Sequence, residues 1–591
     1  MDNEKLNRKK QKATMKDFRR AVKSLKAYRL PIVFSVVLAV VSVVLSIFIP
    51  KILGDITNIA IATFPEVDFA TILQKVGLVL GLLLPSALAG YIQNLILVRI
   101  SAKYTRNLRN QIFDKIAKLP IAYFDKHQYG DTLSRMTNDI ETINNSMSTV
   151  ISNLATSVTT LIGTMVIMLS ISLPLSLVAF IVVPLSVLVV GKIMGRAQKF
   201  FLERQNMLGK LNSEIEEDYS GLLIIKSNSH EMQSKADFDE ANEKLAKVTA
   251  KAQFLSSLSF PVTHIFTNFG YAAVVILGGV LTINGALTIG ALQAFVQYVS
   301  RFNRPITEVA SSTSMMQGLL AATQRIFQFL DETEEAPDFQ PAKKIEKIKG
   351  EVGFHNVNFS YEKDKPVITD FSVKVKPGMK VAIVGPTGAG KTTIINLLMR
   401  FYEPTSGYIT IDGTPIAEMQ RTDERKLFGM VLQDTWLFNG TVEENLRYGK
   451  HSATHADIVK AAKAANVHHV IEALPKGYKT EISEDSDNIS AGEKQLLTIA
   501  RAMVADPPMM ILDEATSNVD TRTEQMIQDS FEKLTTGRTS FVIAHRLSTI
   551  RNSDLILVMK DGNIIEQGNH DTLLALGGFY AELYNSQFAD T

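Results

Sequence analysis

Long apolar segments without charged residues recur through the first half of the chain and stop near residue 312. A helix needs about 20 apolar residues to cross roughly 30 Å of hydrocarbon. Six segments reach or approach that length, and the sixth is the weakest because Arg301 interrupts it. The predicted spans are 30–49, 76–98, 147–171, 174–191, 260–281 and 288–299 onward.

Short loops with little charge join the spans in pairs, whereas the other connections are long and basic. Eleven Lys or Arg residues precede Leu30, and eight lie within 99–135. Positive charge marks the cytoplasmic side, so we expect the N-terminus, the long connections and everything after about residue 310 in the cytoplasm. The charged, Pro-free stretches 99–118 and 203–215 have helical periodicity, which predicts that the membrane helices continue well beyond the bilayer.

The basic N-terminal segment, 1–29, carries four apolar residues at helical spacing: Phe18, Val22, Leu25 and Tyr28. This pattern predicts an amphipathic helix on the membrane surface, with a nucleic-acid arm or a signal peptide as the alternatives. The whole-chain charge of +2 gives no reason to expect a nucleic-acid partner. The lack of a cleavable signal and the charge pattern favour a bacterial plasma membrane, although an organelle membrane would give a similar pattern.

The composition changes after the stretch 331–345, which is acidic and then rich in Lys and Glu. Apolar, β-branched runs now alternate with helical segments, the pattern of a mostly parallel sheet covered by helices. We therefore expect a six-helix membrane domain at 30–330, a linker at 331–345 and a soluble α/β domain at 346–591. The clearest strand candidates are 380–384, 429–432, 509–512 and 540–543.

A phosphate-binding loop follows the first of these strands. Gly385-Pro-Thr-Gly-Ala-Gly-Lys391-Thr392 matches G-x-x-x-x-G-K-[ST] between a strand and a helix. Its backbone N–H groups would wrap phosphates, Lys391 would reach the β and γ oxygens, and Thr392 would ligate Mg²⁺. ATP and Mg²⁺ are thus the predicted cofactors. The predicted phosphate-binding residues are Gly385, Pro386, Thr387, Gly388, Ala389, Gly390, Lys391, Thr392 and Thr393.

A second motif supplies carboxylates. The apolar run that begins at Met509 delivers Asp513 toward Mg²⁺, and Glu514 follows it directly. Glu514 is positioned to polarise the attacking water, so we expect it to be catalytic. These two motifs are shared by many P-loop ATPases, including kinases, helicases and switch GTPases, and do not distinguish among them.

The segment from Asn488 to Gln495 contains Ser490 and Gly492 and ends eighteen residues before Asp513. It resembles the signature sequence of the ATP-binding-cassette (ABC) family, which completes the ATP site of the opposite subunit. The resemblance implies that Ser490 and Gly492 contact nucleotide. It also implies the following roles, in the family's order along the chain: Tyr361 stacks on adenine, Gln433 senses the γ-phosphate and ligates Mg²⁺, Asp520 crosses the dimer, and His545 is the catalytic switch histidine.

Each of these assignments has an ordinary structural alternative when it is taken alone. Tyr361 would then be an edge-strand aromatic, Gln433 a solvated strand end, and His545 a core histidine. Their occurrence in series is what favours the ABC interpretation. The expected catalytic set is Glu514, His545 and Gln433.

The membrane half resembles the exporter branch of the same family. The resemblance rests on short cytoplasmic stretches and implies that some of them form short helices that dock on the ATPase domain. Without it, these stretches would be interpreted as solvated helix faces. They are Tyr123-Phe-Asp125, Gly130-Asp-Thr-Leu-Ser-Arg135, Asn138-Asp139, Gly221, Ile225-Lys226, Glu231, Gly285–Gly290 and Arg325-Ile-Phe327.

The signature departs from the family's usual Leu-Ser-Gly-Gly-Gln at three positions, with Ile489, Ala491 and Glu493. A methyl group at 491 crowds an approaching phosphate, and Glu493 adds negative charge near an anionic ligand. We therefore expect an asymmetric heterodimer, in which a partner half-transporter has an unmodified signature and a degenerate catalytic site. Several bacterial multidrug exporters that resemble this chain are built that way. The alternative is a homodimer that tolerates the variant signature.

The resulting prediction is ATP-driven export of amphipathic or hydrophobic small molecules, of the multidrug type, by alternating access. A lipid or peptide exporter is the first alternative, and an ATP-gated channel or regulatory module is another. The six spans exclude a soluble ABC ATPase, and an importer ordinarily keeps its membrane subunit on a separate chain. Candidate cavity-lining residues are Met165, Met168, Phe266, Asn268, Tyr271 and Gln293, each of which is equally well explained by helix packing or lipid contact.

Overall fold

The computed structural model describes residues 20, 23–345, 347–433, 435–483, 488–513, 520–544 and 547–588. Contacts between Cα atoms divide the chain into two compact units. The first comprises Met1–Ala117 and Tyr129–Glu332, and the second comprises Lys118–Gln128 and Thr333–Thr591. Each unit is described separately below.

The described residues of the first unit form helices and the turns between them, as expected for the membrane half. Its two longest helices, α4 (Phe69–Ile116) and α8 (Leu173–Ser220), have 48 residues each. At 1.5 Å per residue they are about 72 Å long, more than twice the thickness of the hydrocarbon core. They therefore continue far beyond a bilayer, as the charged periodic stretches predict. The other helices are α2 (Arg29–Ile47), α3 (Ile49–Ala62), α6 (Tyr129–Ser134), α7 (Ile140–Ile171), α9 (Leu222–Ser227), α10 (Glu231–Ser257), α11 (Ser259–Ile283) and α12 (Ile289–Leu330).

Five helical segments in the described part of the chain are long and apolar enough to cross a membrane. They contain the first five predicted spans. The sixth predicted span lies on α12, a continuous 42-residue helix that includes Arg301, Arg304 and Glu308. Arg301 donates a hydrogen bond to the carbonyl oxygen of Ser46 at 2.9 Å. The charges on α12 explain why composition alone makes this span the weakest.

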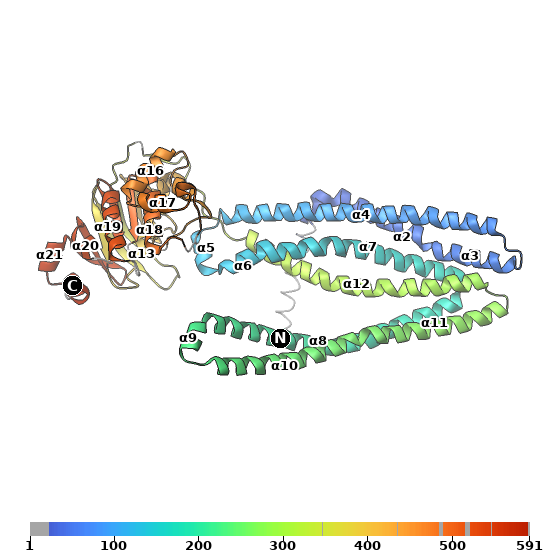
Figure 1. The fold of residues 1–591 in the computed structure, drawn as a ribbon. Coiled ribbons are helices and arrows are strands. Elements are labelled where there is room, and N and C mark those ends of the chain that lie inside the picture. The colour runs from blue at the N-terminus through green and yellow to red at the C-terminus, as the bar shows by residue number, and fades with distance from the viewer. Residues whose placement is uncertain are drawn as a thin grey trace. The chain divides into compact units, whose positions relative to one another are not determined.

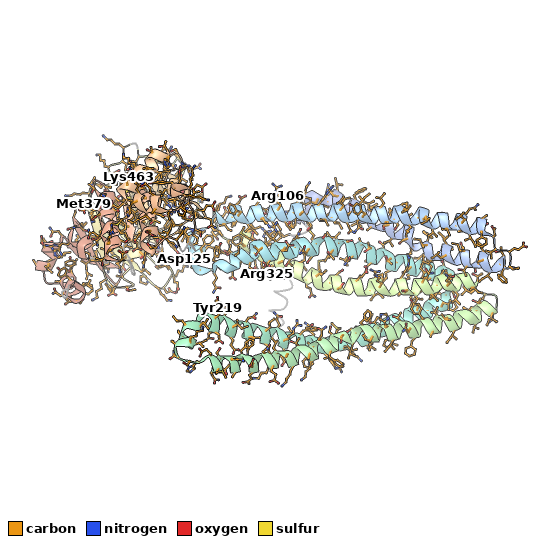
Figure 2. All side chains as sticks on the ribbon, in the orientation of Figure 1. Arg106, Asp125, Tyr219, Arg325, Met379 and Lys463 are labelled. Carbon is orange, nitrogen blue, oxygen red and sulfur yellow. The ribbon has the colours of Figure 1, made fainter. Side chains whose placement is uncertain are left out.

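The helices of the first unit form two groups (Figure 1). Helices α2, α4, α7 and α12 pack against one another, whereas α8 packs mainly against α10 and α11. A π-helical turn, Arg135–Asp139, precedes α7. Asp139 in this turn accepts hydrogen bonds from Arg325 of α12, with Arg325 Nε 2.9 Å from the carboxylate. Arg325 is labelled in Figure 2. This ion pair connects Asn138-Asp139 with Arg325-Ile-Phe327, two of the stretches on which the exporter resemblance rests.

Only part of the predicted N-terminal amphipathic helix lies in the described residues. Leu25–Tyr28 forms a short 3-10 helix that leads into α2. Arg20 pairs with Asp331 at the end of α12, and its guanidinium lies 4.5 Å from the ring centroid of Phe327. Phe18 and Val22 lie outside the described residues.

The second unit is built around a six-stranded sheet in the order β12-β11-β3-β10-β9-β6. All neighbouring pairs are parallel except β11 with β12. This is the α/β arrangement predicted from the sequence, and the four candidate strands fall on β3, β6, β9 and β10. The strands are β3 (Lys380–Val384), β6 (Phe428–Val431), β9 (Met509–Asp513), β10 (Thr539–Ile543), β11 (Leu555–Lys560) and β12 (Asn563–Gly568).

A four-stranded antiparallel sheet, β2-β1-β4-β5, completes the β part of this unit. Apolar residues of both sheets and of α13 (Lys391–Leu398) form one core, and a second core lies under α18 (Ala491–Ala505) and α19 (Thr521–Thr535). The short helix α5 (Ile121–Lys126) also belongs to this unit, although it lies between α4 and α7 in the sequence. The strands of the antiparallel sheet are β1 (Val352–Phe359), β2 (Ile368–Val375), β4 (Ser406–Ile411) and β5 (Thr414–Pro415).

Candidate nucleotide site

The candidate phosphate loop lies at the carboxyl edge of the six-stranded sheet. Strand β3 ends at Val384, the loop follows, and α13 begins at Lys391. Parallel strands β9 and β6 end at the same edge, where Asp513 is the last residue of β9 and Gln433 follows β6. The carboxyl edge of an open α/β sheet is where such folds bind ligands. The structure therefore brings three separate sequence motifs to one place.

The backbone of the loop requires glycine at two closely packed positions. Gly385 has φ 155°, and a Cβ atom there would lie 2.3 Å from the carbonyl oxygen of Met559. Gly390 has φ 95°, and a Cβ atom would lie 2.6 Å from Ile368 Cδ1. These positions hold the loop close to β11 and β2. A side chain at either position would displace the N–H groups that the motif needs for an anion.

Lys391 folds over the loop and donates hydrogen bonds to the carbonyl oxygens of Gly385 and Pro386, at 2.8 and 3.1 Å. Burial lowers the pKa of Lys391, and the nearby carboxylate of Asp513 opposes that shift. A cavity of about 110 Å³ lies beside the loop, with Lys391 and Tyr584 in its lining. A cation next to N–H-rich backbone fits a phosphate group.

The predicted Mg²⁺ ligands are consistent with a metal that is shared with a nucleotide. Thr392 and Gln433 are exposed, and Asp513 is half-buried at the end of β9. No group of three His, Cys, Asp or Glu side chains suited to a metal occurs in the described part of the chain. Mg²⁺ is commonly held by one or two protein ligands together with substrate phosphates and water. The residues present fit that kind of site and do not form an all-protein cage.

Tyr361 lies in an aromatic cluster that leads away from the loop. Its ring is edge-on to those of Phe359 and Tyr402, with centroids 4.8 and 4.9 Å away. Its hydroxyl lies 3.2 Å from the hydroxyl of Thr393, at the start of α13. Tyr402 in turn donates a hydrogen bond to Asp125 of α5. Polar and aromatic contacts therefore join α5 to the phosphate-loop helix within this unit.

The candidate signature forms the start of α18, and Ser490 is its N-cap. The Ser490 N–H donates to the Glu493 carboxylate at 2.8 Å, and the Glu493 N–H donates to the Ser490 hydroxyl at 3.3 Å. This reciprocal pair is a capping box. Ser490 and Ala491 are exposed, whereas Gly492 is buried. The Glu493 carboxylate thus lies at the helix N-terminus, where the helix dipole favours negative charge.

The remaining predicted residues are placed as follows. Asp520 is the N-cap of α19 and accepts hydrogen bonds from the N–H groups of Arg522 and Thr523 at 3.1 and 3.0 Å. Hydrogen bonding from Thr523 lowers the pKa of Asp520, so its carboxylate stays ionised. Glu514 and His545 lie outside the described residues. Their roles stay predictions from the sequence.

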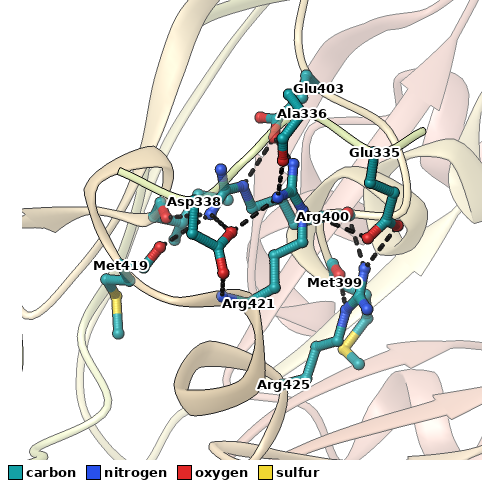
Figure 3. A network of polar contacts seen from close by, with 10 residues as sticks. Glu335, Ala336, Asp338, Met399, Arg400, Glu403, Met419, Arg421 and Arg425 are labelled. Carbon is teal, nitrogen blue, oxygen red and sulfur yellow. Dashed lines mark hydrogen bonds and ion pairs between the residues drawn. The ribbon is translucent and has the colours of Figure 1, made fainter. Parts of the chain in front are cut away.

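Beyond the nucleotide motifs, Arg421 fixes the segment that enters the second unit. Arg421 begins α14 (Arg421–Arg425) and is almost fully buried. Its guanidinium donates to the carbonyl of Ala336 at 2.6 Å and to carboxylates of Asp338 and Glu403 at 2.7 and 3.0 Å (Figure 3). One side chain therefore holds together the linker, α14 and the segment that follows α13.

Arg400 and Arg425 extend this network (Figure 3). Arg400 is buried and donates to Glu403 at 2.8 Å, and Arg425 donates to Glu335 at 3.4 Å. The N–H of Glu335 donates to the carbonyl of Lys118, just before α5, at 2.9 Å. We call Arg400, Arg421 and Arg425, with their carboxylate partners, the linker clamp. It attaches the linker to the ATPase core next to the segment that carries α5.

A fourth carboxyl group is enclosed within the linker clamp. Glu424 is fully buried on α14, and neither of its oxygens has a hydrogen-bond partner among the described residues. Burial raises the pKa of Glu424 to about 8, against the opposing charges of Arg425, Arg400 and Arg421. The three arginines are already balanced by three carboxylates, so a fourth negative charge lacks a counterion. Glu424 is therefore mostly protonated at neutral pH.

The sequence analysis did not identify the clamp residues or Tyr402. No short motif surrounds them, because each makes contacts across long separations in the chain. The capping box had a visible signal, since Ser490-Ala-Gly-Glu493 matches the S-x-x-E pattern.

The candidate cavity-lining residues of the membrane unit do not share one environment. Met168 is fully buried in an apolar cluster against which Tyr271 packs. Gln293 accepts a hydrogen bond from Thr57. Met165 is 40% exposed, Phe266 is half-buried and Asn268 is exposed. Packing thus accounts for Met168 and Tyr271, and the structure singles out none of the six as a ligand contact.

Comparison with known proteins identifies both halves of the chain. The family profile for the ABC transporter transmembrane region matches residues 32–306, and the profile for the ABC transporter matches residues 368–517. A fatty acid ABC transporter ATP-binding/permease protein of Mycobacterium bovis is 46% identical, over 88% of this chain and 82% of that protein. The similarity therefore covers both the membrane half and the ATPase half.

Other relatives have different described cargoes. A putative multidrug export ATP-binding/permease protein of Bacillus subtilis is 37% identical over 82% of this chain and 84% of its own length. An ATP-dependent lipid A-core flippase of Syntrophus aciditrophicus is 34% identical over 85% and 83%. The solved structure of a bacterial Atm1-family ABC exporter with ATP bound has a TM-score of 0.73 and 29% identity, covering 95% of this chain and 98% of that one.

Proposed function

Because this chain belongs to the ABC transporter family, as a half-transporter of the exporter type, we propose that it exports amphipathic or hydrophobic small molecules of the multidrug type as one subunit of a heterodimer. ATP hydrolysis coupled to transport, a membrane-spanning helical domain and dimeric action follow from the family itself. The substrate class and the nature of the partner are the proposal. We place the protein in the plasma membrane with its N-terminus and ATPase domain in the cytoplasm.

The observation that carries the heterodimer is the position of Glu493. In the capping box its carboxylate accepts the Ser490 N–H and lies at the N-terminus of α18. A phosphate approaching this helix end would meet a fixed negative charge and a donor that is already bound. The near side of this chain's own site keeps Lys391 and Asp513. A chain that keeps the near side of its own site, and whose blocked signature completes the site of the opposite subunit, fits a partner with the complementary defects.

The nucleotide itself supplies the phosphate anhydride and, with Mg²⁺, the charge that the loop is built to hold. We assign phosphate binding to the loop N–H groups and Lys391, and Mg²⁺ ligation to Thr392, Gln433 and Asp513. Glu514 would orient the attacking water, and His545 would contact the γ-phosphate. Tyr361 would stack on adenine, which would also bring the base into contact with the aromatic cluster next to Tyr402.

Closure of two cassettes needs a path to the membrane helices. Helix α5 provides one, because Asp125 binds Tyr402 and Tyr402 contacts Tyr361.

The grouping of α8 with α10 and α11, apart from α2, α4, α7 and α12, is a second support for dimeric action. A helix pair that extends from its own bundle offers a surface to a second subunit. Nucleotide shifts the two states only through its differential affinity for them.

A transport assay separates the substrate classes. The chain and its neighbouring half-transporter would be reconstituted together in inverted proteoliposomes, with Mg-ATP added outside. The proposal predicts ATP-dependent accumulation of a fluorescent hydrophobic cation, such as ethidium, that is lost in Lys391→Ala. Accumulation of a fluorescent fatty acid, or flipping of a labelled phospholipid, with no transport of the cation would favour the lipid-exporter alternative and refute the multidrug assignment.

A further inference from the structure

An apolar cavity lies at the cytoplasmic end of the predicted membrane bundle. Its volume is about 550 Å³, within the roughly 300–1,000 Å³ of small-molecule sites. Its wall comes from α2, α4, α7 and α12, which pack against one another in the first unit. Ile143, Met147 and Val150 of α7 form one side and are nearly fully buried. Met316 and Leu319 of α12 face the same space.

The level of this cavity follows from the positions of its lining residues along their helices. The first predicted span starts at Leu30, and the cavity is lined by Ile32 and Val33 of that span and by the residues just before it. On α12 it is lined by Met316 and Leu319, which lie after about residue 310, where the chain is expected to enter the cytoplasm. The lining residues of the first span and those of α12 therefore both place the cavity at the boundary between hydrocarbon and headgroups on the cytoplasmic side.

Three cations form the rim of the cavity: Lys23, Lys26 and Arg29. All three are exposed, and none of them makes an ion pair with any residue that the structure describes. The two polar side chains in the remaining lining, Tyr104 and Thr323, are already hydrogen-bonded within the protein. The site thus combines an apolar interior with a positive entrance that pairs with no acidic side chain among the described residues.

Contacts with α4 hold the rim over the cavity. The Ser24 hydroxyl lies 2.7 Å from the Tyr104 hydroxyl, and Asn107 Nδ2 donates to the Tyr28 hydroxyl at 3.0 Å. The rings of Tyr28 and Tyr104 meet edge to face, with centroids 6.4 Å apart. The two hydroxyl contacts flank Lys26 in the sequence. The backbone that carries these charged side chains is therefore held beside the opening of the cavity.

We propose that this cavity binds an anionic phospholipid of the cytoplasmic leaflet, with an acyl chain inside and the headgroup phosphate among Lys23, Lys26 and Arg29. The apolar wall excludes the headgroup from the interior, and three cations match a phosphate at the entrance. Burial of each methylene favours the chain, and the charges select the headgroup. The bound lipid would lie over the contacts that Ser24 and Tyr28 make with α4. This site is separate from the export function proposed above and does not depend on the identity of the cargo.

Native mass spectrometry of the full chain in a neutral detergent tests the proposal. The probes are phosphatidylglycerol and phosphatidylcholine with identical acyl chains. Phosphatidylglycerol is expected to bind about tenfold more tightly or better, since each cation near an anionic headgroup contributes to affinity. The variant Lys23→Gln/Lys26→Gln/Arg29→Gln is expected to lose that preference. The matched control, Lys192→Gln/Arg196→Gln/Lys199→Gln, removes three exposed juxtamembrane cations from α8 and should keep it.

A second variant tests the acyl chain separately. Leu319→Trp adds bulk to the wall while leaving the three cations in place, and it is expected to weaken phosphatidylglycerol binding at least severalfold. Equal binding of the two lipids by the wild-type chain would overturn the proposal. So would unchanged preference in the rim variant, or a loss of equal size in the α8 control. Tighter binding of palmitate than of phosphatidylglycerol would instead make the cavity a fatty-acid site, which also contradicts the assignment.

Discussion

Replacing the buried Glu424 with glutamine is expected to stabilise the ATPase unit, and by more as the pH rises toward 8. The pKa of Glu424 is raised from its ordinary 4.5 to about 8 because the group is buried. Between these values the folded state keeps a proton that the unfolded chain releases. The contribution of Glu424 to the free energy of unfolding is therefore greatest below pH 4.5 and is lost as the pH rises through the folded pKa.

The size of the effect follows from that interval. Stability changes by about 1.4 kcal/mol per pH unit for one proton, which gives a total of at most about 5 kcal/mol between pH 4.5 and 8. Glutamine has nearly the same volume and no charge at any pH, so Glu424→Gln escapes this loss. The difference between variant and wild type should increase across the interval and become constant above about pH 8.

The single tryptophan of the chain makes this measurable in the intact protein. Trp436 lies in the second unit, so a change in tryptophan fluorescence on unfolding reports that unit. Urea midpoints would be compared from pH 5 to 8.5 for wild type, Glu424→Gln and the control Asp423→Asn on the same helix. A gap between Glu424→Gln and wild type that does not change with pH would refute the reasoning, because it would mean that Glu424 is ionised and stabilised by the arginines.

Three further changes test the nucleotide unit. Lys391→Ala is expected to reduce ATP hydrolysis by about two orders of magnitude, whereas the exposed Lys376→Ala should leave the rate unchanged. Tyr402→Phe removes the hydroxyl that is hydrogen-bonded to Asp125, so basal ATP hydrolysis should persist while the amount of cargo transported per ATP falls. An unchanged ratio of transported cargo to hydrolysed ATP would exclude this contact from coupling. Glu493→Gln keeps the cap acceptor without its charge and should tighten binding of a non-hydrolysable ATP analogue at the partner's site, which this signature faces, about two- to fivefold. Equal Kd values at that site would count against electrostatic blocking.

The sequence predicted features that depend on local pattern. Apolar length predicted the membrane helices, and the spacing of the glycines and Lys391 predicted a loop between β3 and α13. The candidate signature forms the start of α18, but Glu493 was considered only as a charge near phosphate. Its side chain turns back onto the Ser490 N–H, which the S-x-x-E pattern indicates and the functional interpretation overlooked.

Other features depend on contacts between distant segments, which a single sequence does not encode legibly. Arg421 contacts Asp338, 83 positions away, and Tyr402 contacts Asp125, 277 positions away. A buried arginine or tyrosine has the same appearance in a sequence as an exposed one. The weakness of the sixth span has a similar cause, because Arg301 is accommodated by the carbonyl of Ser46 on another helix.

The central claim is that this chain supplies one competent catalytic site to a heterodimer. Mg-ATP hydrolysis in lipid tests it most directly, for the purified chain alone and with the neighbouring half-transporter co-expressed, with Glu514→Gln as the control. The account predicts little hydrolysis by the chain alone, and activity with the partner that is lost in Glu514→Gln. Full turnover by the chain alone, also lost in Glu514→Gln, would show a working homodimer and contradict the account.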